Sequence, residues 1–469
     1  MSIMKEMKRV HLVGIGGSGL SAIAVVLLER GVKVSGSDRQ LSSLAQRVQV
    51  AGGQVFVGHD PQNVTGADLI VMSSAIPDDN VEIQAARAAG IPVYKRADFL
   101  GVLTADTRTI AIAGTHGKTT TTAMITWVLT SAGYDPSYII GGVSLNLGRN
   151  AHYGGGRFFV IEADEYDWMF LGLNPEIAVV TNIEHDHPDC FPTPEDFYQA
   201  FTAFAGHIAP QGVLFACGDD AGASRLLADL FDQPYQKLAY GINSRDYPYI
   251  ATDLTVNSSG GYSFQVVRQD FPDRSTACQL QVPGMHNVLN AVAVMAVADY
   301  LGIDWGQAAA GLAEFQGTGR RFETRGQAGG ITVIDDYAHH PSEIRATLAA
   351  ARSRFPGQEV WAVWQPHTYS RMRLMQDEFA TAFVQADHVL VTEVFAAREP
   401  VPQDGYSAQQ VVAQMHHPDA RFTPGIQQAQ EYLLSHLSLG DVVLVLSAGD
   451  ADALSLALLD SLTGSAEFI

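Results

Sequence analysis

The chain has 469 residues, of which 47% are hydrophobic and 17% charged, and its 50 acidic against 29 basic side chains leave a formal net charge of −21. This composition is typical of globular proteins and excludes a disordered chain, and the length predicts about three domains. The negative charge argues against electrostatic binding of nucleic acid. The three cysteines, Cys190, Cys217 and Cys278, are too far apart for a zinc or disulfide pattern and are typical of a reducing cytosol.

The first apolar run, Val10 to Leu28, follows Lys5, Lys8 and Arg9 and so has the outline of a signal peptide. Its four glycines would weaken an apolar helix, whereas "VHLVG" before them is typical of a buried strand and "SAIAVVLLERG" after them of a helix. We therefore expect a strand, a loop and a helix here. No other apolar stretch is long enough to span a bilayer, so we expect no membrane partner.

The glycines of this loop form the pattern G-x-G-x-x-G at Gly14, Gly16 and Gly19, and Asp38 ends the next expected strand. Strand, glycine loop, helix and a later acidic residue make a dinucleotide fingerprint, in which a pyrophosphate approaches the backbone at the helix N-terminus. A tight turn without a ligand would use the same glycines. The pattern also does not distinguish NAD from another nucleoside diphosphate, so redox chemistry stays an alternative.

The second segment opens with "AIAGTHGKTTTTAMI", a phosphate-binding loop in which Ile112 stands where the usual pattern has its first glycine. We expect Ile112 to finish the strand and Gly114 to make the turn. Gly117, Lys118 and Thr119 retain the flexible backbone, the cation and the magnesium-binding hydroxyl that ATP phosphates need. A glycine- and threonine-rich loop without a ligand would not explain a lysine and a threonine at the start of a helix.

Acidic side chains and histidines follow the next two expected strands. "VIEADE" ends in Glu162, Asp164 and Glu165, where carboxylates could hold a magnesium ion that bridges ATP oxygens; the alternative is a solvated acidic strand end. "NIEHDHPD" contains His185 and His187. We expect them on alternate faces of a strand, so that one belongs to the site and the other is structural or exposed.

The third segment carries a second group of polar candidates at a predicted strand end. In "DDYAHHP", His339 and His340 follow the strand "ITVIDDY", at the edge where ligands gather in open α/β sheets. Arginines nearby could clamp phosphate or carboxylate groups, or could equally form surface ion pairs. These further candidates are Arg320, Arg321, His367 and Arg371.

Short β-branched runs alternate with helical patterns along the whole chain, which predicts α/β domains with parallel sheets. We expect a Rossmann-like N-terminal domain over residues 1–106 and a central P-loop ATPase-type domain over 107–322. A Rossmann-like C-terminal domain would follow over 323–469. These limits rest on changes in composition.

The ordered motifs together resemble the Mur ligase family over nearly the full length of the chain. "HLVGIGGSGLSAIA" is similar to the family's UDP-binding start, "GTHGKTTTT" to its ATP loop, "EADEYD" and "TNIEHDHPD" to its metal segments, and "HNVLNA" to its adenine-contacting helix. "FQGTGRRFE", "DDYAHHP" and "QPHTYSR" complete the order, and the last two are more typical of the member that adds alanine. Ser447 and Thr368 depart from residues common in the family.

The resemblance implies a role for each matched position. Lys118 would hold the ATP phosphates, Thr119 and Glu165 a first magnesium ion, and His187 a second, while His340 is a candidate general base. The residues expected at ATP are Gly114, Thr115, Gly117, Lys118, Thr119, Thr120, Asn287, Asn290, Arg321 and Asp336. The residues expected at the other substrates are Gly14, Gly16, Gly17, Gly19, Asp38, Ser73, Ser74, His116, His367 and Arg371.

The implied activity is an ATP- and Mg²⁺-dependent ligation that joins L-alanine to the lactyl carboxylate of UDP-N-acetylmuramate through an acyl phosphate. A recycling ligase that adds a tripeptide to the same nucleotide is the main alternative. An NAD-dependent dehydrogenase or a nucleotide-binding protein without turnover would leave the phosphate loop or the metal carboxylates unexplained. We further expect small-molecule partners only, a cytoplasmic location, and a monomer or weak homodimer.

Overall fold

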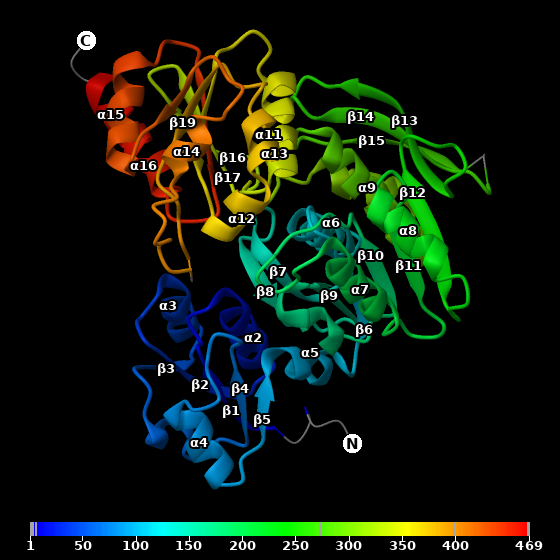
Figure 1. Cartoon of the computed structure of the whole chain (residues 1–469). Helices are drawn as coiled ribbons and strands as arrows, with labels where there is room; N and C mark the ends of the chain where they lie inside the picture. The colour runs from blue at the N-terminus through cyan, green and yellow to red at the C-terminus, as the bar shows by residue number, and fades with distance from the viewer. Residues whose placement is uncertain (1–3, 5–6, 272–273, 398, 467–469) are drawn as a thin grey trace.

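The computed structural model describes residues 4, 7–271, 274–397 and 399–466, which form three domains around three β-sheets (Figure 1). Most neighbouring strands run parallel, and helices connect and cover them, so the predicted α/β class with three domains is confirmed. The first sheet and its last helix, α5 (Arg96–Thr104), end before β6 (Arg108–Ala113), which belongs to the second sheet. The third sheet begins with β16 (Glu323–Ala328). The domain limits themselves stay a prediction.

The N-terminal sheet has the order β3-β2-β1-β4-β5, and all its pairings are parallel. Chain order reverses on either side of β1, and such a switch point leaves a crevice at the carboxyl ends of the strands. Its elements are β1 (Arg9–Val13), α2 (Ser18–Glu29), β2 (Lys33–Asp38), α3 (Ser43–Val50), β3 (Gln54–Val57), η1 (Pro61–Val64), β4 (Leu69–Met72), α4 (Val81–Ala88), β5 (Val93–Lys95) and α5.

The central sheet has ten strands in the order β15-β14-β13-β12-β11-β10-β6-β9-β7-β8. Its middle is parallel, while β14, β15 and β8 pair antiparallel at the two edges. Its elements are β6, α6 (Lys118–Ser131), β7 (Ser137–Ser144), β8 (Arg149–His152), β9 (Phe158–Glu162), η2 (Tyr166–Gly172), β10 (Ile177–Val180), α7 (Pro194–Ala205), β11 (Val213–Cys217), α8 (Ala221–Asp229), β12 (Gln236–Gly241), β13 (Tyr249–Val256), β14 (Tyr262–Arg268), β15 (Ser275–Gln279), α9 (Met285–Tyr300) and α10 (Trp305–Ala313).

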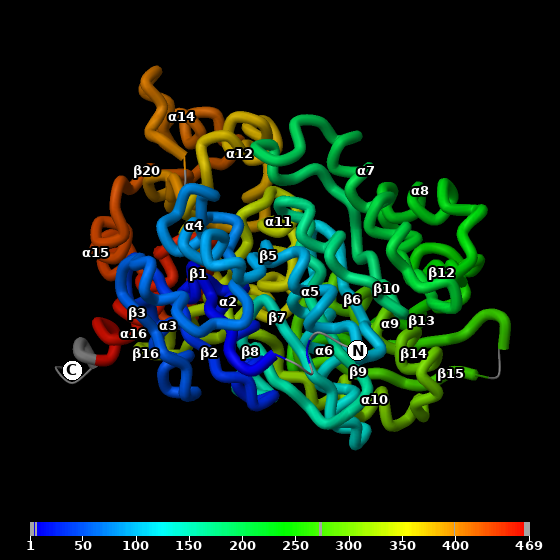
Figure 2. The backbone as a smooth tube through the Cα atoms, turned by 90° about the horizontal axis from the view of Figure 1, so that it is seen from below, coloured from blue at the N-terminus to red at the C-terminus, as the bar shows by residue number. Residues whose placement is uncertain are grey.

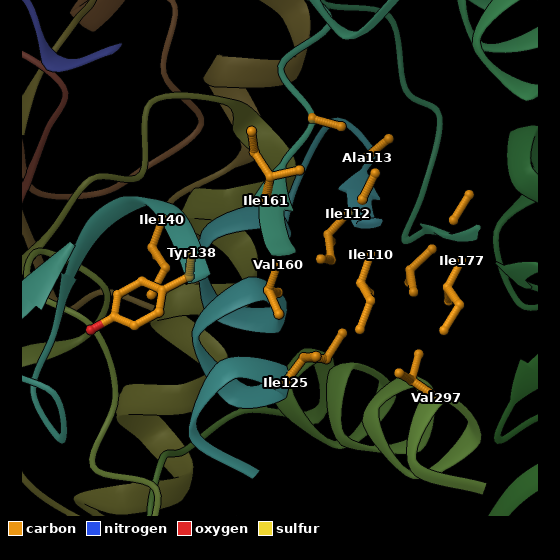
Figure 3. Packing of buried hydrophobic residues seen from close by; sticks show 14 of the residues in the cluster. Ile110, Ile112, Ala113, Ile125, Tyr138, Ile140, Val160, Ile161, Ile177 and Val297 are labelled. Atoms are coloured by element: carbon orange, nitrogen blue, oxygen red, sulfur yellow. The ribbon is translucent and has the colours of Figure 1, made fainter. Parts of the chain in front are cut away.

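The core of the central domain explains why the phosphate loop is rigidly placed. Side chains of β6, β9 and β10 pack against α6 and α9, as Figure 3 shows for Ile110, Val160, Ile177, Ile125 and Val297. All five are at most 2% exposed. Strand β6 and helix α6 flank the phosphate loop, so burial on both sides fixes the two ends of the loop.

The C-terminal sheet has the order β16-β17-β21-β18-β19-β20, parallel except for the β16–β17 pair. Two hydrophobic clusters cover its two faces. Its elements are β16, β17 (Ile331–Asp336), α11 (Pro341–Arg354), β18 (Val360–Gln365), α12 (Tyr369–Leu374), α13 (Gln376–Thr381), β19 (His388–Val391), α14 (Ala408–Val412), β20 (Ala420–Phe422), α15 (Ile426–His436), β21 (Val442–Ser447) and α16 (Ala453–Ala466).

The N-terminal and central domains share one hydrophobic cluster and are also joined by polar side chains. Glu29 of the N-terminal domain pairs with Arg149 at 2.8 Å and His152 at 2.7 Å on β8. Strands β13–β15 lie at the end of the molecule away from the N-terminal domain (Figure 2).

None of the described helices combines the length and apolar character that crossing a bilayer requires.

Candidate functional site

The phosphate loop between β6 and α6 has the expected form. Ile112 is the fifth residue of β6, and Gly114 and Gly117 then adopt φ angles of 133° and 81°. A Cβ atom at Gly114 would lie 2.0 Å from Thr181 Oγ1, and one at Gly117 would lie 3.0 Å from Asn290 Oδ1. Both positions therefore require glycine for conformation and for space.

Hydrogen bonds tie this loop to the segment after β10. The Thr115 hydroxyl donates to the Glu184 carbonyl at 2.8 Å and accepts from the Glu184 amide at 2.9 Å. The His116 amide donates to Asn182 Oδ1 at 2.8 Å, and the Thr181 hydroxyl donates to the His116 carbonyl at 2.5 Å. The loop is thus held in shape by its own domain before any ligand binds.

Lys118, Glu165 and His187 meet beside the loop. Lys118 Nζ donates to Glu165 Oε1 at 2.9 Å and to the carbonyls of Gly114 and Thr115 at 2.5 and 3.1 Å. Although burial disfavours the charged amine, the carboxylates of Glu165 and its acidic neighbours raise the pKa of Lys118. The amine is therefore fully charged, and the bonds to its own loop hold it where phosphate oxygens would bind.

The same group of side chains fits a magnesium ion. Glu165 is 1% exposed, and its Oε2 has no hydrogen-bond partner in the described part of the chain. His187 Nε2 lies 3.7 Å from Glu165 Oε1, and Thr119 is buried at the start of α6. A buried carboxylate oxygen without a partner among the described residues suits a hard cation that also takes phosphate oxygens.

The expectation that His185 and His187 lie on a strand is wrong. Strand β10 ends at Val180, and both histidines lie in an irregular segment where His187 has a φ of 56°. The segment leaves the sheet because its backbone serves the phosphate loop. His185 Nε2 donates to the Phe191 carbonyl at 2.8 Å, and its ring packs against Phe197, so His185 has a structural contact while His187 faces Glu165.

A buried ion pair joins the central and C-terminal domains next to His187. Arg371 donates from Nε and Nη2 to Asp186 Oδ1 at 3.0 and 2.7 Å, and both side chains are at most 5% exposed. Arg371 Nη1 also donates to His367 Nδ1 at 2.9 Å. Burial and the charge of Arg371 lower the pKa of His367 to about 4. Arg371 thus contacts both His367 and Asp186, the residue before His187, and its guanidinium is bound to protein.

His116 forms a second bridge between the same two domains. Its Nε2 lies 3.0 Å from Glu184 of the central domain and its Nδ1 lies 3.2 Å from Glu343 of α11. Burial disfavours the charged ring, but the two carboxylates outweigh it and raise the pKa of His116 to about 9. Ser342 also donates to Glu184 at 2.6 Å. A charged histidine of the phosphate loop therefore holds α11 against that loop.

His340 and His339 differ in which ring nitrogen carries the proton. His340 is 1% exposed and caps α11, because its Nδ1 accepts from the Ser342 amide at 3.3 Å. Burial and charged His116 lower its pKa, so we assign the proton of the neutral ring to Nε2, which has no partner among the described residues. His339 Nδ1 donates to the Tyr337 carbonyl at 2.9 Å, which leaves its Nε2 as an acceptor.

A cavity of about 200 Å³ runs from the phosphate loop to α9 and α11. Asn287 and Asn290, which are both 5% exposed, line it, and Asn290 donates to Asn287 Oδ1 at 3.2 Å. Burial raises the pKa of Asp336 to about 6 although Arg321 is nearby, and both also line the cavity. The predicted residues on its wall are His116, Gly117, Thr119, Thr120, Asn287, Asn290, Arg321 and Asp336.

The N-terminal glycine loop lies at the carboxyl ends of β1, β2 and β4. Asp38 accepts from the Gly16 amide at 2.8 Å, and a Cβ at Gly14 would lie 3.0 Å from the Ser73 Cβ. Gly19 packs against Arg96, whose guanidinium is 3.9 Å from Asp164. Arg96 thus lies between the glycine loop and the acidic segment that follows β9. Gly17 caps α2 and Ser74 is exposed after β4.

Glu343 and Arg96 were missed by sequence reasoning. Glu343 closes a capping box with His340, since its side chain accepts from the backbone of His340 at the start of α11. The pattern of a cap residue followed three positions later by glutamate was visible in "HHPSE". Nothing local marks Arg96, which begins an ordinary helix.

Comparison with known proteins gives matches over all three domains. The family profile described as "Mur ligase family, catalytic domain" matches residues 9–108, "Mur ligase middle domain" residues 112–298, and "Mur ligase, glutamate ligase domain" residues 320–449. A UDP-N-acetylmuramate–L-alanine ligase from Renibacterium salmoninarum is 42% identical over 465 residues, which cover 99% of this chain and 98% of that protein. One from Thermobifida fusca is 41% identical and covers 97% of each.

Solved structures give similar results. The UDP-N-acetylmuramate-alanine ligase MurC from Thermotoga maritima superposes with a TM-score of 0.81 at 28% identity, over 98% of this chain and 100% of that one. A murein peptide ligase from Psychrobacter arcticus gives 0.74 at 26% identity, over 97% and 99%. Both comparisons span all three domains, so the arrangement of the sheets is shared as well as their individual folds.

Proposed function

The chain belongs to the Mur ligase family, and on that premise we propose that it joins L-alanine to the lactyl carboxylate of UDP-N-acetylmuramate, with ATP converted to ADP and phosphate. Full-length identity of about 42% to ligases of this name is the observation that carries the assignment. The reaction belongs to peptidoglycan precursor synthesis. We further propose a cytoplasmic enzyme that is a monomer or a weak homodimer and takes small-molecule substrates only.

The first step needs positive charge at the phosphate loop. The lactyl carboxylate attacks the γ-phosphate of ATP, and ADP leaves as an acyl phosphate forms. Two anions must approach one another, so charged Lys118 would neutralise phosphate oxygens once these replace the carbonyls that it now contacts. Magnesium held by Thr119, Glu165 and His187 would supply further positive charge to the same oxygens.

The second step needs a neutral amine and a stabilised oxyanion. The amine of L-alanine attacks the acyl carbon, and phosphate departs from the tetrahedral intermediate to leave an amide. On the assigned tautomer, His340 Nε2–H would donate to an oxyanion or phosphate rather than accept a proton. Burial lowers the pKa of His339 to about 3, which makes that ring a poor base, so the proton that the amine loses would leave with the departing phosphate. We therefore propose His340 as a donor in the site.

Water exclusion protects the acyl phosphate. His116 bridging Glu184 and Glu343 and the pair of Arg371 with Asp186 hold the C-terminal domain over the phosphate loop. An acyl phosphate hydrolyses in water, so chemistry in a site closed by these contacts favours transfer to the amine. Asn287 and Asn290 would contact adenine and Arg321 the nucleotide phosphates, while Asp336 would lie in the same cavity at the interface with the C-terminal domain.

The decisive experiment measures phosphate release from Mg-ATP with UDP-N-acetylmuramate and a series of amines: L-alanine, glycine, L-serine, the recycling tripeptide, and none. We expect release that requires L-alanine and yields an amide product, and none with Lys118→Ala. Release with the tripeptide alone would move the assignment to the recycling ligase, the class of the Psychrobacter structure. Release that needs no amine would reject a ligase.

A further inference from the structure

A buried carboxylate of the N-terminal domain lies beneath the carboxyl ends of its strands, where the glycine loop is found, and it is not part of the site described above. Glu82, in the first turn of α4, is fully buried. Its Oε2 accepts from the Ser37 hydroxyl at 2.5 Å, and its Oε1 accepts from Asn63 Nδ2 at 2.6 Å and from the Asp60 amide at 3.3 Å. His11 Nε2 lies 3.6 Å away. A buried carboxylate with this many donors is held as an anion, although burial alone would disfavour the charge.

The groups that Glu82 holds also shape the glycine loop. Ser37 is fully buried near the end of β2, and its carbonyl accepts from the amides of Gly14 and Ile15 at 2.8 and 3.1 Å. The next residue, Asp38, accepts from the Gly16 amide at 2.8 Å. One hydrogen bond therefore separates Glu82 from the residue whose backbone carbonyl fixes the first turn of the glycine loop.

Glu82 also fixes the orientation and proton position of His59. His59 Nδ1 lies 3.1 Å from the Ser37 hydroxyl oxygen and 3.2 Å from Glu82 Oε2. The single Ser37 proton is already donated to Glu82, so we assign a hydrogen to His59 Nδ1, which faces two acceptors. The His59 loop is joined to the same edge, since the Gly58 amide donates to the Asp38 carbonyl at 2.7 Å.

We propose that Glu82 is a positioning residue for the nucleoside diphosphate of the substrate: through Ser37 it holds the glycine loop, and it holds the His59 loop directly. The inference rests on the proposed function for the identity of the nucleotide. Glu82 does not touch the ligand. It keeps two loops that flank the strand ends in their binding geometry, so its loss weakens nucleotide binding while ATP chemistry in the central domain is unaffected.

The test is Glu82→Gln, which keeps the size of the side chain and removes the negative charge of the carboxylate. The glutamine amide can place an NH₂ group against the Ser37 hydroxyl and His59 Nδ1–H, where the carboxylate offered an acceptor. We expect titration calorimetry to show that the Kd for UDP-N-acetylmuramate rises about tenfold or more, the scale for a lost bond to a charged group. The KM for ATP and L-alanine and the kcat at saturating nucleotide should stay within about twofold of wild type.

Asp299→Asn is the matched control. Asp299 is a buried carboxylate of the central domain that accepts from Tyr249 at 2.7 Å and from Trp305 at 3.0 Å and pairs with Arg268 and Arg274. Its loss should lower the melting temperature without changing the nucleotide Kd. If this variant weakens nucleotide binding as much as Glu82→Gln does, the effect is one of general stability and the proposal is overturned.

Ser37→Ala provides a second variant that keeps Glu82 itself. It removes the hydroxyl that lies between the Glu82 carboxylate and the glycine loop. The Kd for UDP-N-acetylmuramate should rise, while the KM for ATP and for L-alanine should stay near the wild-type values. An unchanged nucleotide Kd in Glu82→Gln would overturn the inference and leave the proposed ligase function standing. If Glu82→Gln does not fold, an unchanged nucleotide Kd in Ser37→Ala would overturn it in the same way. If the wild-type enzyme itself does not bind UDP-N-acetylmuramate, the proposed function fails together with the inference.

Discussion

Removing the guanidinium of Arg371 tests whether the domains are held together by charge. Arg371→Met keeps much of the side-chain length but leaves Asp186 buried without its cationic partner. Breaking a buried pair in this way costs about 3–5 kcal/mol. The lower figure fits here, since Asp186 Oδ1 keeps its bond from the His187 amide at 2.7 Å.

This cost falls on the closed arrangement, because Arg371 and Asp186 belong to different domains. About 3 kcal/mol shifts the balance between closed and open molecules roughly a hundredfold. If chemistry occurs only in the closed form, kcat/KM for L-alanine falls by a similar factor. Small-angle scattering should show a larger radius of gyration than for wild type, while the melting temperatures of the separate domains change little.

The double variant Arg371→Met, Asp186→Asn separates two roles of the arginine. Replacing both partners removes the unpaired charge, so the double variant should be more active than Arg371→Met alone. If Arg371 instead acts by binding a substrate carboxylate, the second change restores nothing. A kcat/KM within threefold of wild type for Arg371→Met would refute the argument altogether.

Three further predictions concern the phosphate loop and its ion site. Glu165→Gln should raise the Mg²⁺ concentration for half-maximal activity at least about tenfold, because a neutral amide binds a hard cation weakly. The control is Glu162→Gln, at the last residue of β9. Equal shifts in the two variants would contradict the assignment of Glu165 to the ion. His116 has a raised folded pKa of about 9, so its contribution to stability is complete below pH 6.5 and is lost as the pH rises toward 9; melting temperatures should fall over this range in wild type and stay flatter in His116→Gln. Gly117→Ala should raise the KM for ATP about tenfold, because a Cβ at a φ of 81° would lie 3.0 Å from Asn290 Oδ1; an unchanged KM would show that the loop tolerates the side chain.

Much of the fold could be predicted from the chain because its central strands are continuous apolar runs. β1, β6, β10, β17 and β21 are buried on both faces, and such runs are recognisable without knowledge of their neighbours. Edge strands such as β8 and β20 were not predicted, since they are short and half-exposed. Strand β3 was missed for the same reason.

Local backbone geometry creates part of the site, and that part could be predicted from the amino-acid sequence. A strand, a glycine turn and a helix beginning with Lys118 are adjacent in the chain, and glycine adopts the φ angles of 133° and 81° found at Gly114 and Gly117 without strain. The G-x-G-x-x-G loop and its Asp38 are local in the same sense. The spacing of two histidines does not determine the backbone conformation between them. The strand expected at His185 and His187 was therefore wrong, because contacts with the phosphate loop set the path of that segment.

The charges that meet across domain boundaries could not be predicted, because they are brought together by the packing of the domains. Asp186 and Arg371 are 185 positions apart, and His116 reaches Glu343 across the domain boundary. Their pairing depends on how the C-terminal sheet packs over the central one, and no pattern in either segment encodes the partner. The physical reason is that a charge is stabilised by whatever counter-charge burial places beside it, and that neighbour is chosen by the packing of whole domains rather than by local sequence.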